Sequence, residues 1–381
     1  MEQRIASIIS EYAAQGIHRT GTTVDNESAD WLAARVKAMG VAPELDTWQF
    51  KRVEVVDARF RMGELDISGV PFYDCNYTDA AGVSGSLGEM GSDADIGVAM
   101  TLPYAAGPGY APVEAARKHG THKALLLVTD KRMPADGIAT INAESFGSPF
   151  GPPVLQIANR HWDAIQAAVK RGDKATLVAH CDRVDATAAN VQARIAGADA
   201  SLAPVVVMTP RSGWWRCASE RGGGIAAWLE MMRAVKSAGG ARDVIFTANS
   251  GHELGHTGLD HYLEAHGSLI AGAHMWIHLG ANFVARVMPA VRLQYSDKTA
   301  EGLVRAELAR TALKPARETP PGTRPAGEAR NIFDGGGHYI SILGGNGLFH
   351  HPDDLWPDAV DMKAATAWIS AFVDLSVKLA A

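Results

Sequence analysis

The sequence predicts an α/β fold in which helices flank a mostly parallel central sheet. Three short apolar runs are typical of buried strands, because a strand covered on both faces contains few polar residues. The runs are PVVVMT at 204–209, DVIFTAN at 243–249 and HMWIHL at 274–279. Helical segments with one apolar face, at 222–236 and 361–379, lie between or after these strands. Strands that alternate with helices along a chain favour a parallel sheet with helices on both faces.

The N-terminal segment adds two helices and a pair of strands. A helix is predicted over 2–14 and a second over 26–39, where Gly40 ends the apolar pattern. Two short strands are predicted next, near 44–50 and 53–62.

Residues 65–180 differ in composition from the segments on either side. They are rich in Gly, Pro and short β runs, with only two short helical segments, at 111–119 and 161–171. This composition, with its short strands and helices, predicts a smaller α+β domain inserted into the chain. We therefore expect 1–64 and 181–381 to form the main domain.

Composition and charge favour a soluble globular protein. The 381 residues are 47% hydrophobic and 20% charged, and the net charge is -6, which disfavours a nucleic-acid partner. No apolar run reaches the roughly 18 residues that span a bilayer, and no secretory signal is visible near the N-terminus. The three cysteines form no CxxC pair, so we expect a reducing, cytoplasmic location. We expect a small molecule or a short peptide as substrate, and nothing in the sequence indicates the oligomeric state.

The motif HELGH covers residues 252–256. On a long helix, His252 and His256 would bind zinc and Glu253 would be the base of a metalloprotease. The motif follows a predicted strand directly, and Gly251 and Gly255 interrupt it. We therefore predict a turn between a strand and a loop, rather than a zinc-binding helix.

Five segments, in order along the chain, resemble the aminopeptidase-type zinc peptidases, the group of bacterial leucyl aminopeptidases, glutamate carboxypeptidase and glutaminyl cyclases. The segments are GIHRTGTTVDNESADWLAARVKAMG from Gly16, NVQARIAG from Asn190, SERGGGIAAWLEMMRAV from Ser219, DVIFTANSGHELGHTGLDHYL from Asp243 and FHHPDDLWPDAVD from Phe349. Members of this family often carry a protease-associated domain before the metal-binding half. The resemblance implies the same for residues 65–180.

The resemblance implies a metal site that is only partly retained. The family binds two metals, and its His-x-Asp motif falls here on Thr209-Pro210-Arg211, while a later aspartate ligand falls on Gly280. The remaining ligands fall on Glu220, Glu253 and His350. Two carboxylates and an imidazole suit one catalytic zinc ion, with manganese or iron(II) as alternatives.

The general base of the family falls on His252, and an imidazole can serve as base when it is neutral. Glu328 and His351 are the next candidates for this role. Arg211, Trp214 and Trp215 could contact substrate, the first through its charge and the others as an aromatic wall.

Ordinary structural roles compete with each of these assignments. Glu220 could be a carboxylate at a helix N-terminus, and His252 and Glu253 could be plain loop residues. His350 and His351 could be a surface pair, Arg211 a surface arginine, and Trp214 and Trp215 packing residues.

The leading hypothesis for function is a metal-dependent hydrolase of an amide or peptide C–N bond. A non-enzymatic binding protein on the same fold, as in the transferrin receptors, and a transferase like the glutaminyl cyclases are the alternatives. Metal analysis of the purified protein separates the binding protein from the other two.

Overall fold

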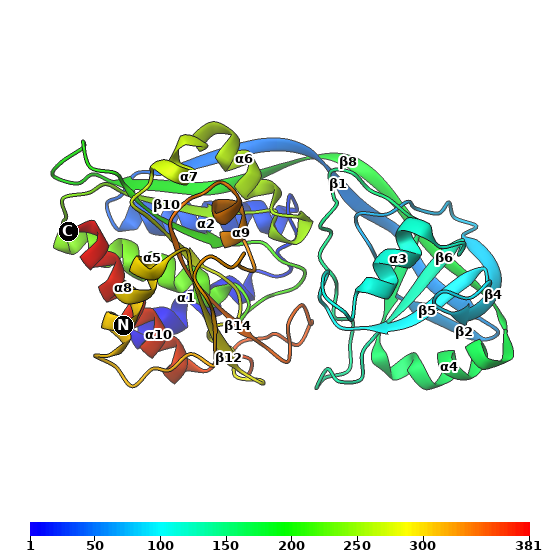
Figure 1. The fold of residues 1–381 in the computed structure, drawn as a ribbon. Helices are drawn as coiled ribbons and strands as arrows, with labels where there is room; N and C mark the ends of the chain where they lie inside the picture. Colours follow the sequence, from blue (N-terminus) through cyan, green and yellow to red (C-terminus); the bar gives the residue numbers. More distant parts are fainter.

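The computed structural model describes residues 1–381, whose strands form one fourteen-stranded sheet that extends through two lobes (Figure 1). Four parallel neighbours form the centre of the larger lobe. In spatial order they are β10 (Val244–Asn249), β9 (Val205–Pro210), β11 (Met275–Leu279) and β14 (Tyr339–Gly345). Antiparallel β12 (Ala290–Tyr295) and then β13 (Arg317–Thr319) complete one edge. The predicted α/β class, with a mostly parallel central sheet, is confirmed.

Helices cover both faces of this sheet because successive residues of its strands point to opposite sides. Val205 and Val207 of β9 join the core formed with one set of helices, while Val206 and Met208 pack on the other set. The first set is α1 (Glu2–Ala14), α2 (Thr23–Ala38), α5 (Gly222–Ala238), α8 (Lys298–Leu308) and α10 (Met362–Ala380). The second set is α6 (Thr257–His266), α7 (Ser268–Gly272) and α9 (Ala329–Asp334).

A long two-stranded ribbon joins the lobes (Figure 1). It consists of β1 (Pro43–Met62) and β8 (Lys174–Ile195), which pair antiparallel along nearly their whole length, with a bulge between Val55 and Asp57. The two short strands expected near 44–50 and 53–62 are therefore wrong. No Gly, Pro or Asn lies between Phe50 and Val53 to make a turn, so β1 stays extended and pairs with a distant segment.

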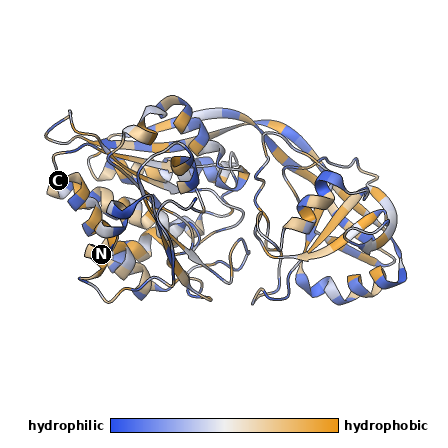
Figure 2. Ribbon diagram, in the orientation of Figure 1, coloured by the Kyte–Doolittle hydropathy of each residue, from blue (hydrophilic) through white to orange (hydrophobic).

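The smaller lobe continues the sheet beyond this ribbon. Its strands are β2 (Leu65–Ser68), β3 (Val70–Pro71), β4 (Val83–Glu89), β5 (Ile96–Thr101), β6 (Ala124–Thr129) and β7 (Val154–Ile157). Figure 2 shows that these strands are mostly apolar. Leu125 and Leu127 pack with α3 (Ala111–His119), and Leu126 and Val128 with α4 (Trp162–Arg171), which follows the short turn η1 (Asn159–His161).

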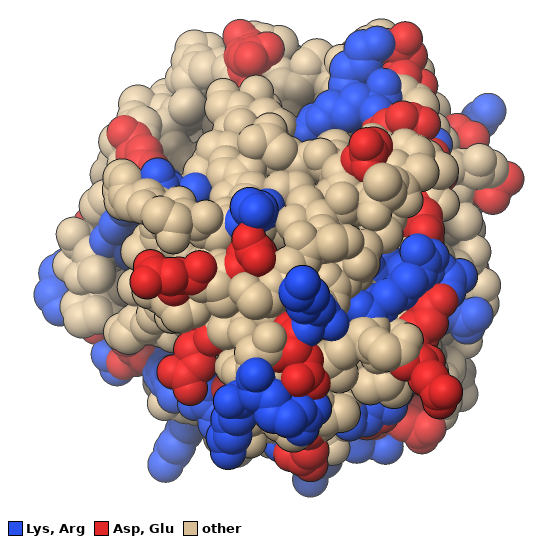
Figure 3. Space-filling model, turned by 90° about the vertical axis from the view of Figure 1, so that its right-hand side faces the viewer, with Lys and Arg blue, Asp and Glu red and all other residues tan.

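The assignment of residues 65–180 to a protease-associated-like domain stays a prediction, because β1 and β8 run through both lobes. On the face seen in Figure 3, basic and acidic side chains are interspersed over the surface. None of the helices is both long enough and apolar enough to cross a bilayer. The cytoplasmic location stays a prediction.

Candidate functional site

A cluster of buried polar side chains lies where the central parallel strands end. It is built from the loop between β9 and α5, the turn η2 (His252–Leu254) after β10, the start of α9 and the loop after β14. In open α/β sheets this edge collects functional groups, because loops from neighbouring strands meet there. Gly251 allows the sharp turn into η2, since its φ is 84° and a Cβ atom there would collide with Thr257 and Gly258.

Glu220 and His350 lie together in this cluster, as the sequence predicts. The Oε1 atom of Glu220 is 3.4 Å from Nε2 of His350, and both residues are buried. Nδ1 of His350 lies 2.8 Å from the backbone oxygen of Thr140. A carbonyl oxygen can only accept, so Nδ1 carries the proton and Nε2 presents its lone pair to Glu220.

Glu253 is directed elsewhere by hydrogen bonds that the sequence did not reveal. Its Oε1 atom accepts from the backbone N–H of Thr20 at 2.8 Å and from the Thr20 hydroxyl at 2.6 Å. Its Oε2 atom accepts from the hydroxyl of Ser212 at 2.6 Å. Both carboxylate oxygens are therefore engaged, one by the segment before α2 and the other by the loop after β9.

Arg221 is the residue of this site that sequence reasoning missed. Its Nη2 atom lies 2.9 Å from Oε1 of Glu220, and its Nε–H donates to the backbone oxygen of Ser212 at 2.7 Å. Neither Nη1 nor Nη2 has a hydrogen-bond partner, although the side chain is fully buried. Burial lowers the pKa of Arg221, but Glu220 together with the other nearby acidic groups raises it above its usual value, so the guanidinium is charged. The signal was an arginine directly after a retained acidic position, where the resembling family has asparagine.

His252 forms a pair with Glu328 at the other side of the cluster. Nδ1 of His252 lies 3.1 Å from Oε1 of Glu328, the residue before α9. Burial raises the pKa of Glu328 to about 8. Burial and the nearby Arg221 charge hold the pKa of His252 well below its usual value, so the imidazole is neutral at neutral pH.

The two histidines of HELGH do not form a zinc-binding helix. The turn η2 ends at Leu254, and both Gly255 and His256 have positive φ values, of 78° and 71°. The His256 ring stacks on His252 at 4.8 Å, and its Nδ1 atom pairs with Oδ1 of Asn331. The expected turn between strand and loop is therefore present.

The residues at this site do not fit the single metal that the sequence predicted. No group of three or more His, Cys, Asp or Glu side chains is arranged to hold a metal ion. Glu253 is occupied by Thr20 and Ser212, and a guanidinium nitrogen already lies against Glu220. Two like unit charges 4 Å apart repel by about 4 kcal/mol at an effective dielectric constant of 20, and a dication doubles this. The ligand set Glu220, Glu253 and His350 stays a prediction, and these three side chains are not grouped to hold an ion in this structure.

Arg211, Trp214 and Trp215 each make structural contacts, and their role in binding substrate stays a prediction. Arg211 is fully buried, with Nη1 bonded to the backbone and side chain of Asp25, and Nη2 bonded to the backbone oxygen of Ala189. The indole N–H of Trp214 donates to Asn142, and that of Trp215 to the backbone oxygen of His350. All three hold segments of the site together.

A loop of the smaller lobe covers the cluster. The segment between β6 and β7, here called the covering loop (residues 130–153), bonds directly to site residues. The N–H of Thr140 donates to the backbone oxygen of His350 at 3.1 Å, and that of Ala143 donates to the backbone oxygen of Glu253 at 2.8 Å. Glu144 forms an ion pair with Arg330 of α9 at 2.5 Å.

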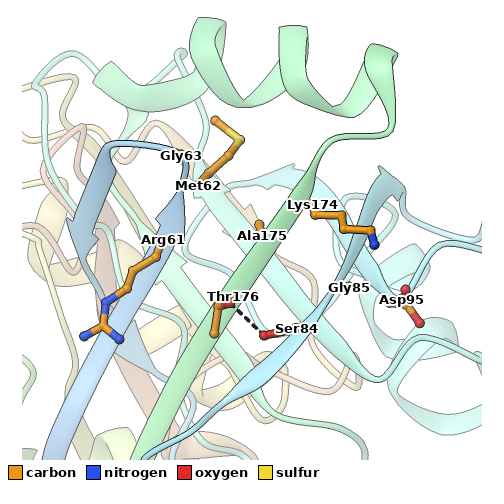
Figure 4. A pocket seen from close by; sticks show the side chains of 9 residues that line it. All are labelled: Arg61, Met62, Gly63, Ser84, Gly85, Asp95, Lys174, Ala175 and Thr176. Atoms are coloured by element: carbon orange, nitrogen blue, oxygen red, sulfur yellow. Dashed lines mark hydrogen bonds between the residues drawn. The ribbon is translucent and has the colours of Figure 1, made fainter.

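Two hollows lie outside the cluster. A groove of about 780 Å³ runs beside the covering loop and is lined by Trp48 and Phe50 of β1, Phe146, and Thr257 next to His256. A hollow of about 470 Å³ lies at the far end of the smaller lobe, where Figure 4 shows Ser84 bonded to Thr176 among Arg61 and Lys174. Only the groove adjoins the site.

The arrangement as a whole has the fold of the zinc aminopeptidases. The zinc aminopeptidase BSAP from Bacillus subtilis superposes with a TM-score of 0.79 and 15% sequence identity, over 99% of this chain and 95% of that chain. An aminopeptidase from Aneurinibacillus sp. strain AM-1 gives 0.73 and 16%, over 100% of this chain and 94% of its own. A peptidase M28 precursor from Shewanella amazonensis SB2B gives 0.78 and 17%, over 100% and 95%. No protein-family model and no curated protein matches the sequence.

Proposed function

We propose that this protein hydrolyses an amide or peptide C–N bond in a small molecule or short peptide. The observation that carries the proposal is the buried pair His252–Glu328, which lies close enough to Arg221 to be affected by its charge, in a chain with an aminopeptidase fold. Attack of water on a carbonyl group needs a general base and a positive group that stabilises the oxyanion, and a proton-transfer pair beside a fixed positive charge supplies both. The peptide-like substrate is suggested by the solved structures with this fold, which are aminopeptidases.

Each residue has a definable role in this reaction. Above the Glu328 pKa of about 8 the carboxylate is ionised, so Nδ1–H of His252 donates to it and Nε2 can accept a proton from the attacking water. The free N–H groups of Arg221 would stabilise the negative charge that develops on the carbonyl oxygen. The carbon–nitrogen bond then breaks, and the proton held by His252 passes to the leaving amine nitrogen. No step requires a metal.

The groove beside the covering loop provides a route for substrate. Trp48, Phe50 and Phe146 give it an aromatic lining, and Thr257 connects it to the turn that carries His252. An apolar or aromatic side chain of the substrate would bury its surface there.

Assays of the purified full chain test the function. We expect hydrolysis of at least one member of a panel of aminoacyl anilides, amino-acid amides and dipeptides. In addition, His252→Ala should lower kcat by about 100- to 10,000-fold, the usual worth of a general base. His266→Ala is the matched control, since that histidine lies at the end of α6 outside the cluster. No turnover of any panel member by the unmodified protein, or equal rates for His252→Ala, would reject the proposal.

A binding protein without catalysis is the second candidate, and one observation favours it. Glu253 is held by Thr20 and Ser212 beneath a covering loop that bonds to the site backbone. A closed site with its carboxylates already paired is also what a ligand-retaining protein would need. Ligand-dependent thermal stabilisation by panel compounds that are not cleaved would identify this case. No observation favours the cyclase alternative.

A further inference from the structure

Four buried polar atoms without hydrogen-bond partners meet at one point of the cluster. They are the donors Nη1 and Nη2 of Arg221 and the acceptors Oε1 of Glu220 and Nε2 of His350. The Glu220 oxygen is 2.9 Å from Nη2 and 3.4 Å from the His350 nitrogen. A carboxylate oxygen and an imidazole lone pair at this separation form a cation-binding pair, and the adjacent cation is the guanidinium.

We propose that Arg221 is a resident cation that takes the place of a divalent metal in this site and keeps such a metal from binding. The charge is fixed there by two contacts, the one to Glu220 and the hydrogen bond from Nε to Ser212. Ser212 in turn donates to Glu253, so one hydroxyl-bearing residue links the guanidinium to the second carboxylate. The guanidinium of Arg221 thus supplies a positive charge near Glu220, Glu253 and His350, where the sequence predicted a metal.

The position of Arg221 in the chain explains why its guanidinium lies where a metal would otherwise bind. It precedes the first turn of α5, where Gly222, Gly223 and Gly224 follow. A Cβ atom at Gly223 would come within 2.5 Å of a Val284 methyl group, and one at Gly224 equally close to the hydroxyl of Thr209. The helix start is therefore packed tightly against the sheet, which leaves the long arginine side chain inside the cluster.

Zinc titration of the full chain tests this inference without reference to any activity. Zinc alone is added to the unmodified protein and to Arg221→Ala, and bound metal is counted by elemental analysis and calorimetry after dialysis. We expect no stoichiometric zinc in the unmodified protein and one zinc per chain in Arg221→Ala, bound at least about 100-fold more tightly because the like charge is gone. Adding Glu220→Gln to Arg221→Ala should remove the gained zinc.

Arg233→Ala is the matched control, because Arg233 lies on the same helix, is half exposed and pairs only with Glu230. It should bind no more zinc than the unmodified protein. If Arg221→Ala does not fold, Arg221→Gln removes the charge with less loss of volume and replaces it in the titration. One zinc per chain in the unmodified protein overturns the inference, and so does a folded charge-free variant that gains none. Because the readout is bound metal, failure here is distinct from failure of the proposed hydrolysis.

Discussion

Two arginines are buried near the carboxyl ends of the strands, and they differ in how their charge is used. Arg211 and Arg221 both have side chains that are 0% exposed. Both terminal nitrogens of Arg211 are hydrogen-bonded, to Asp25 and Ala189, whereas Arg221 has only the ion-pair contact of Nη2 with Glu220 and no hydrogen bond at either terminal nitrogen. Buried polar groups are almost always paired, so the N–H groups of Arg221 without hydrogen bonds need an explanation, and our proposals assign them to a ligand. The two side chains are equally buried, so the difference between Arg211, which is structural, and Arg221, to which we assign a function, lies in their hydrogen bonds.

The two arginines also divide the two positions that the resembling family gives to metals. Arg211 lies in the segment that replaces the family's His-x-Asp motif, and its ion pair with Asp25 ties α2 to the strand ends. Arg221 follows Glu220 on the side where Glu220 and His350 remain together. One position has become part of the core, and the other is the one to which we assign the proposed reaction.

The largest expected effect comes from removing the paired arginine. Arg211→Met should lower the free energy of unfolding by about 3–5 kcal/mol, because Asp25 is left as an uncompensated buried carboxyl group. Urea denaturation measures this loss, and Arg233→Met on the surface of α5 is the control. Activity per folded molecule should change little. A loss below about 1 kcal/mol would show that Arg211 is not the structural member of the comparison.

Removal of the unpaired arginine should act on catalysis instead. Arg221→Gln should lower kcat by about 100- to 1,000-fold, the usual cost of losing a donor that stabilises an oxyanion. Its effect on unfolding should be smaller than that of Arg211→Met. The assay is run with a chelator present, so that zinc gained by the variant does not contribute. Arg221→Lys keeps the charge and should recover part of the rate; an unchanged kcat in Arg221→Gln would remove Arg221 from the reaction.

The helices and buried strands of this protein could be predicted from local pattern because each one buries a continuous apolar stripe or run. The helices expected over 2–14 and 111–119 have those bounds in the structure. The pairing of β1 with β8 could not be predicted, because it joins segments that lie on either side of the whole smaller lobe. Strand pairing over such a distance depends on tertiary packing, which no local window contains.

The site was predictable only where the resemblance to a known family covered its residues. Glu220 and His350 were expected together from conserved spacing in a resembling family, and they lie 3.4 Å apart. The fate of Glu253 depends on Thr20, a residue 233 positions away whose hydroxyl has no distinctive sequence context. Arg221 was visible in the sequence, but its importance follows from the absence of partners, which only coordinates reveal.

A third arginine, Arg330, extends the comparison to the surface and has the smallest expected effect on stability. Its ion pair with Glu144 is partly exposed, with side-chain exposures of 26% and 33%. Pairs of this kind contribute only about 0.2–1 kcal/mol, so Arg330→Ala should barely change the urea midpoint. It should nevertheless increase amide hydrogen exchange in the covering loop, because Glu144 is the side chain that ties this loop to α9. Arg324→Ala, which removes another surface pair near α9 without touching the loop, is the control. Equal exchange in both variants would show that the loop is held by its other bonds, including the backbone bonds to His350 and Glu253 and the Trp214–Asn142 bond. Faster exchange confined to Arg330→Ala would show that an exposed pair gates access to the site while contributing little to stability.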